Sequence, residues 1–193
     1  MTALERVRAV LGRSIEVKQQ LLESCASEIA EAAERVAATF ARGGKVLLFG
    51  NGGSAADAQH IAAEWVGRYV GERRALPAIA LNANPSELTA VANDYGYDRV
   101  FVRGVEAHGR DGDVAIALST SGNSPSVLTA VEAARARGLF TIGLTGKGGG
   151  QLAALVDLAL RVPSDETPRI QECHIAIGHA LCEVVDEAFR GEG

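Results

Sequence analysis

The sequence predicts a three-layer α/β fold, in which a mainly five-stranded parallel sheet lies between helices and a helical arm precedes it. Five short apolar runs alternate with helical stretches, which is typical of a parallel sheet covered on both faces. Aromatic residues make up only 5% of the chain, as expected where helices pack closely on such a sheet. With 193 residues, 47% of them hydrophobic, the chain suits a single domain spanning 1–193.

The arm comes first, at residues 1–42. It contains no proline, and apolar side chains recur every three or four positions from Leu21 to Phe40, which predicts helix. We expect this helix to be broken once or twice. Gly43 and Gly44 end it, and the α/β core, 45–193, follows.

The core begins with a strand and ends with a helix. The predicted strands are the apolar runs at 45–50, 78–81, 114–118, 141–144 and 158–162. Helices are expected at about 54–68 and 168–189. Apolar residues surround much of the last helix, more than an outer helix needs, so with the arm it predicts a helical interface between copies of the chain.

Charge and composition exclude several classes of function. The net charge of −5 gives no general attraction to nucleic acid, so an anionic ligand needs a local site. No segment reaches about 18 uninterrupted apolar residues, and the N-terminus has no apolar leader. The three cysteines are odd in number and lack CxxC spacing, which disfavours a disulfide framework or a zinc finger. We therefore expect a cytoplasmic protein without nucleic-acid or membrane partners.

Two polar loops follow predicted strands, at the edge where open α/β sheets bind ligands. The hydroxyl-rich loop, 119–124, places four hydroxyls and a glycine directly before a helix, an arrangement that suits a phosphate dianion. The absence of a Walker lysine favours a monophosphate over a nucleoside triphosphate. The alternative is that these residues are ordinary N-caps before Pro125. The loop residues predicted to bind substrate are Asn51, Gly52, Gly53, Ser54, Ser119, Thr120, Ser121 and Ser124.

The loops resemble those of the sugar isomerase (SIS) domain family, and the chain is similar to its phosphoheptose isomerases. Those enzymes convert sedoheptulose 7-phosphate to D-glycero-D-manno-heptose 7-phosphate, the first step of bacterial heptose synthesis for lipopolysaccharide and other surface glycans. The resemblance covers about 45–180 and rests on the order and spacing of the motifs at 50–54, 59–60, 64, 67–69, 93–94, 119–124, 169–172, 174 and 179. Some relatives carry an acidic residue where this chain has Pro168, so that position receives no role.

The resemblance implies the roles of the remaining site residues. His60 and Glu64 are four apart and share a helix face, which alone is an ordinary pair. In the family the corresponding glutamate is a catalytic base, so Glu64 is expected to be the base and His179 to transfer protons. Isomerisation through an enediol needs such a base and acid. The implied ligands of one zinc ion per subunit are His60, Glu64, Gln171 and His179, and the further implied substrate contacts are Glu64, Arg68, Asn93, Asp94 and Gln171.

Helix geometry adds a constraint on this site. Gln171 and His179 are eight residues apart, about 12 Å along a straight helix, so one chain would struggle to bring both to one ion. We therefore expect a homo-oligomer, a tetramer by resemblance, with active sites at subunit interfaces. His174, close to Gln171, either lies behind the site residues or packs in the core.

A non-catalytic SIS-domain protein of the replication-initiator-associating type is the main alternative. Such a protein would share both loops but has no need for a carboxylate at Glu64 and an imidazole at His179. A sugar-phosphate-sensing regulator would add a DNA-binding domain, for which the chain has no room.

Overall fold

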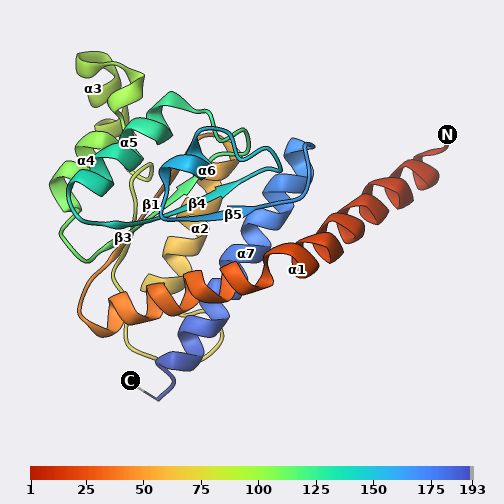
Figure 1. Ribbon diagram of the computed structural model, residues 1–193, viewed down its shortest axis with the longest axis horizontal. Helices are drawn as coiled ribbons and strands as arrows, with labels where there is room; N and C mark the ends of the chain where they lie inside the picture. The colour runs from red at the N-terminus through yellow and green to blue at the C-terminus, as the bar shows by residue number, and fades with distance from the viewer. Residues whose placement is uncertain (192–193) are drawn as a thin grey trace.

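The computed structural model describes residues 1–191 and shows a five-stranded parallel sheet between two layers of helices (Figure 1). The strand order is β2-β1-β3-β4-β5. The predicted fold class is confirmed, and each predicted strand lies within about one residue of its observed bounds. The strands are β1 Val46–Gly50, β2 Ala78–Ala80, β3 Val114–Leu118, β4 Phe140–Thr145 and β5 Leu158–Arg161.

Helices cover both faces of this sheet. They are α1 Ala3–Ala41, α2 Gly53–Val66, α3 Pro85–Tyr95, α4 Val102–His108, α5 Pro125–Ala136, α6 Leu152–Leu155 and α7 Thr167–Ala188, with a 3₁₀ turn, η1, at Tyr97–Arg99. No helix within residues 1–191 is long and apolar enough to cross a membrane.

The alternation of side chains along each strand builds two apolar cores. In β1, Val46 and Leu48 pack with α1, α2 and α7, whereas Leu47 and Phe49 face the layer formed by α4, α5 and α6. Figure 1 shows these two helical layers on opposite sides of the strands. Both faces are buried, which is why the strands are continuous apolar runs rather than alternating ones.

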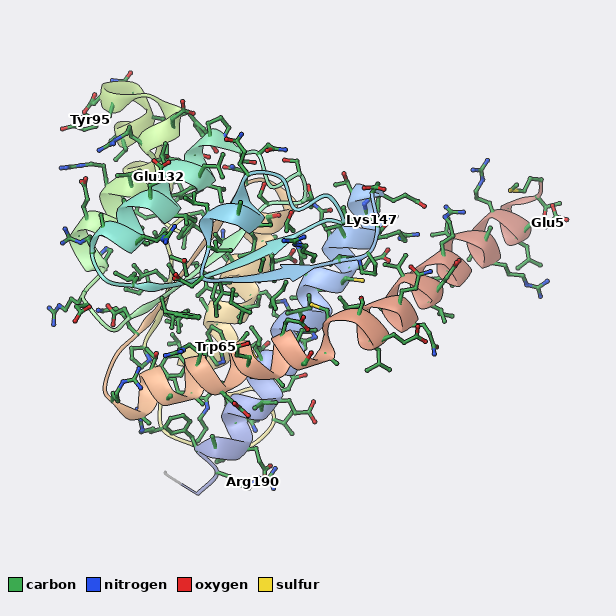
Figure 2. All side chains as sticks on the ribbon, in the orientation of Figure 1. Glu5, Trp65, Tyr95, Glu132, Lys147 and Arg190 are labelled. Atoms are coloured by element: carbon green, nitrogen blue, oxygen red, sulfur yellow. The ribbon has the colours of Figure 1, made fainter. Side chains whose placement is uncertain are left out.

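The N-terminal arm is one uninterrupted helix of 39 residues, so the expected breaks are wrong. Thr2 and Glu5 form a capping box at its start, and Gly12 lies in open space, where it costs helix propensity but clashes with nothing. The outer half of α1 extends beyond the core, with Glu5 near its tip (Figure 2). On this half Leu4, Leu11 and Ile15 are each more than half exposed.

The terminal helix α7 lies against both α1 and α2. Its residues Cys173, Ile177, Leu181 and Cys182 are almost fully buried in this layer. The chain itself therefore covers much of the apolar surface of α7, although Val184 stays 45% exposed.

The two polar loops lie side by side because of the strand order. β1 pairs with β2 on one side and β3 on the other, and Gly50 at the end of β1 is the partner of Leu118 at the end of β3. The chain therefore departs in opposite directions from the ends of these strands, a topological switch point where open α/β sheets bind ligands.

Candidate active site

The hydroxyl-rich loop, 119–124, connects β3 to α5. The hydroxyl oxygens of Ser119 and Ser124 are 3.1 Å apart and share a hydrogen bond. Ser124 is the N-cap residue of α5, but among the described residues its side chain makes no capping hydrogen bond. The geometry therefore does not support a simple N-cap role for Ser124, and it leaves the helix N-terminus able to accept an anion.

The loop after β4, at residues 146–151, packs against the hydroxyl-rich loop. Gly122 has φ +66°, and a Cβ there would overlap the carbonyl oxygen of Gly149. The Asn123 amide donates to the carbonyl of Ser121 (3.0 Å) and accepts from the backbone N–H of Gln151 (3.1 Å). A pocket of about 230 Å³ lies between the hydroxyl-rich loop, the loop after β4 and the start of α7. Its lining residues are Thr120, Ser121, 146–149, Ser164, Asp165, Thr167 and Ile170. Lys147 lies beside the start of α7 in Figure 2.

The first polar loop, 50–54, leads into α2. Gly52 is the N-cap residue with φ +57°, a conformation that favours glycine. The Asn51 amide donates to the Ser126 hydroxyl (3.0 Å) and accepts from the Tyr97 hydroxyl (2.9 Å). Asn51 thus links the start of α2 to the start of α5. Sequence reasoning missed Tyr97 and Ser126, because neither lies in a motif or at a diagnostic spacing.

Two turns further along α2, a carboxylate and two imidazoles meet. His60 Nε2 lies 3.2 Å from Glu64 Oε1 and 3.1 Å from His179 Nε2, and the two imidazole rings are 5.1 Å apart. The Tyr69 ring lies 5.6 Å from the His179 ring. Parallel contact between α2 and α7 thus joins residues 119 positions apart. One turn before His60, burial raises the pKa of the Asp57 carboxyl.

The donor set of this cluster suits zinc, which prefers imidazole and carboxylate ligands. Two nitrogens on one tetrahedral zinc ion would lie about 3.3 Å apart. This separation is close to the 3.1 Å between the Nε2 atoms of His60 and His179. Across residues 1–191, however, no group of three or more His, Cys, Asp and Glu side chains is arranged to hold a metal ion. Gln171 is not nearby, because its amide packs against Gly53 at the other end of α2.

The sequence profile of the SIS domain family matches residues 11–146 of the chain. The chain is also 61% identical to the phosphoheptose isomerase of Rhodospirillum rubrum over 168 residues, which cover 87% of this chain and 89% of that protein. The chain belongs to the phosphoheptose isomerase family.

Solved structures of phosphoheptose isomerases share the fold. The protein from Neisseria gonorrhoeae is 46% identical with a TM-score of 0.91, over 96% of this chain and all of that one. The protein from Francisella tularensis is 38% identical with a TM-score of 0.93, over 97% of this chain and 100% of that one. These relatives and the cluster at His60 favour a phosphoheptose isomerase over a non-catalytic SIS-domain protein.

Three predicted substrate residues, Arg68, Asn93 and Asp94, make their contacts outside the two polar loops and the cluster at His60. Arg68 follows α2 and pairs with exposed Glu72 at 3.4 Å. Asn93 donates to Asp94 at 2.8 Å, and both are exposed on α3. Within residues 1–191, the ion pair and the hydrogen bond of these side chains are made to neighbours in sequence and not to Glu64.

His174 proves to be a core residue. It is fully buried on α7, with the Thr145 backbone beside its ring. Burial lowers the pKa of its imidazole to about 4, so the side chain is neutral near pH 7.

Proposed function

We propose that the chain isomerises D-sedoheptulose 7-phosphate to D-glycero-D-manno-heptose 7-phosphate in the cytoplasm, as the first step toward heptose precursors of lipopolysaccharide or other surface glycans. The observation that carries the proposal is that Glu64 and His179 both contact His60. His60 and Glu64 lie on α2, which starts beside the hydroxyl-rich loop. The loop accounts for a phosphate, and the cluster accounts for proton transfer. The names of the relatives supply the heptose.

The reaction moves one proton between adjacent carbons. Glu64 removes the proton from C1 of the ketose, while a proton is added to the oxygen on C2, giving an enediol. His179 exchanges the oxygen protons, since imidazole titrates near neutral pH. Returning the carbon proton to C2 and removing the proton from the C1 oxygen gives the aldose, with no net gain or loss of protons.

Zinc is part of the proposal, with His60 and Glu64 as ligands from one chain. His179 either completes this ligand set or transfers protons, because an imidazole nitrogen bound to a metal ion carries no proton. Bound there, the ion would polarise the substrate carbonyl. In the same chain, the Gln171 amide packs against Gly53. Gly53 is seven residues before His60, or about 10 Å along α2. Gln171 therefore reaches a shared ion only from a neighbouring copy, which supports a homotetramer with active sites at its interfaces.

Two apolar surfaces support this assembly. The first is the exposed stripe on the outer half of α1, which includes Leu4, Leu11 and Ile15. The second is a pocket of about 300 Å³ between α1 and α7, lined by Lys18, Leu21, Leu22, Ala26, Ile29, Ala176, Ile177 and Ala180. Exposed apolar patches of this kind mark association surfaces.

The test is to incubate the protein with sedoheptulose 7-phosphate and follow aldose formation. Glu64→Gln should lower kcat by about 10²-fold or more, the scale of losing a general base. The matched control is Glu132→Gln, an exposed carboxylate on α5 in the opposite layer (Figure 2), which should retain full activity. No turnover by the unaltered protein would refute the substrate, whereas near-normal turnover by Glu64→Gln would refute the base.

A further inference from the structure

A buried ion pair joins the ends of the two helices that carry Glu64 and His179. Arg73, in the segment after α2, donates from Nε to Asp186 Oδ1 at 2.9 Å, and Asp186 lies in the last turn of α7. The Arg73 side chain is entirely buried and that of Asp186 is 9% exposed. Removing two charges from water is costly, and well-packed apolar residues often stabilise a fold as much. Stability alone is therefore a weak explanation for this pair.

The remaining donors of Arg73 cap the end of α2. One terminal nitrogen donates to the carbonyl of Glu64 (2.8 Å), and the other donates to the carbonyls of Trp65 (2.9 Å) and Gly67 (3.0 Å). The last carbonyls of a helix lack partners within it, and the last turn of α2 contains no basic residue. Arg73 supplies donors to these carbonyls, of which that of Trp65 also accepts from the backbone N–H of Leu76 (3.0 Å), and it supplies the favourable positive charge. One of the carbonyls it holds belongs to Glu64 itself.

Asp186 fixes the other side of the same site. Its second oxygen accepts from the backbone N–H groups of Val70 (3.0 Å) and Gly71 (3.3 Å), directly after Tyr69, whose ring faces His179. His179 and Asp186 are seven residues apart, so they share one face of α7. A carboxylate in the last turn of a helix is unfavourable, and Arg73 compensates it.

We propose that Arg73 and Asp186 are positioning residues that hold Glu64 and His179 at the separation that proton transfer requires. Glu64 lies only two residues before the end of α2, where helices fray, and a displacement of about 1 Å can cost about 10²-fold in rate. The inference rests on the catalytic roles proposed for Glu64 and His179.

The test compares Arg73→Met, Arg73→Lys and Asp186→Asn with Asp113→Asn as a matched control. Asp113 is also a buried carboxylate; it pairs with Lys45 and accepts from the backbone N–H groups of Lys45 and Arg110 (both 2.9 Å). It lies just before β3, at the end of the sheet opposite the hydroxyl-rich loop. Its loss should therefore lower the thermal midpoint without disturbing the site.

We expect Arg73→Met and Asp186→Asn to lower kcat by about 10²-fold with KM changed less than about threefold, because the hydroxyl-rich loop is intact. Arg73→Lys should recover part of kcat, since it keeps the charge but not the planar fork. Asp113→Asn should keep kcat at assay temperatures well below its midpoint. If kcat stays within twofold in Arg73→Met and Asp186→Asn, or falls equally in Asp113→Asn, the inference is wrong. Should Arg73→Met not fold, Asp186→Asn and Arg73→Lys are judged by the same criteria.

A second readout does not depend on the substrate. The chain has four histidines, whose ring NMR signals can be assigned by single substitutions. At one fixed pH, Arg73→Met and Asp186→Asn should move the signals of His60 and His179 and leave that of His108 in place. Unmoved signals would overturn the inference. Moved signals in a protein that does not turn over sedoheptulose 7-phosphate would refute the proposed substrate, and would still show that Arg73 and Asp186 fix the positions of His60 and His179.

Discussion

Substitution of Gly122 by alanine tests whether the hydroxyl-rich loop depends on its contact with Gly149. At Gly122, φ is +66°, and a Cβ would overlap the Gly149 carbonyl oxygen and lie 2.9 Å from Thr145 Oγ1. Gly112 has a similar φ of +84°, but nothing lies within 4 Å of its Cβ position. Gly112→Ala therefore measures the backbone cost alone, and Gly122→Ala measures the backbone cost together with crowding.

The left-handed conformation costs a residue with a Cβ about 1–2 kcal/mol, and overpacking adds about 1–3 kcal/mol. We expect the free energy of unfolding to fall by about 1–2 kcal/mol in Gly112→Ala and about 2–5 kcal/mol in Gly122→Ala, measured by urea denaturation. The displaced loop should also raise KM for the sugar phosphate at least tenfold in Gly122→Ala, with KM unchanged in Gly112→Ala.

Two results would refute this reasoning. Equal losses of stability in the two variants would mean that the contact between Gly122 and Gly149 is unimportant. An unchanged KM in a destabilised Gly122→Ala would mean that the loop does not hold the phosphate.

Three further predictions concern His174, the metal and the assembly. The pKa of His174 is about 4 in the folded chain against 6.5 for the free group, so the unfolded chain binds more protons at acidic pH. The free energy of unfolding should therefore fall by about 3 kcal/mol as the pH drops from 6.5 to 4. His174→Leu should remove this pH dependence, measured by urea denaturation at several pH values, and an unchanged dependence would contradict the prediction. Chelation should abolish turnover and added zinc restore it, while His60→Ala should bind less zinc by elemental analysis; a chelator-insensitive rate would argue against the metal. Leu11→Asp, on the exposed stripe of α1, should lower the mass measured by light scattering together with kcat, and an unaltered mass would exclude this stripe from the interface.

Local sequence signals predicted the strands and the hydroxyl-rich loop. The central strands β1, β3 and β4 are buried on both faces, so their apolar runs are recognisable without knowledge of their neighbours. The hydroxyls of Ser119 and Ser124 lie only five residues apart in the sequence. The same signals did not show that α1 is unbroken, because Gly12 resembles a helix breaker until its surroundings are known.

The site shows the limit of local signals more clearly. Spacing alone placed His60 and Glu64 on one helix face, and it separated Gln171 from His179 on another helix, as the structure shows. It gave no sign of the Arg73–Asp186 pair, or of Tyr97 and Ser126 on Asn51.

The sequence by itself therefore determined the kind of fold, the loop chemistry and which residues share a helix face, because these follow from the 2- and 3.6-residue periods and from turn geometry. Only the tertiary structure decided that α2 and α7 pack so that His60 touches His179 and Arg73 holds the carbonyl of Glu64. Such contacts depend on how helices pack on a twisted sheet, which no local period encodes, and they bring together residues as far as 119 positions apart.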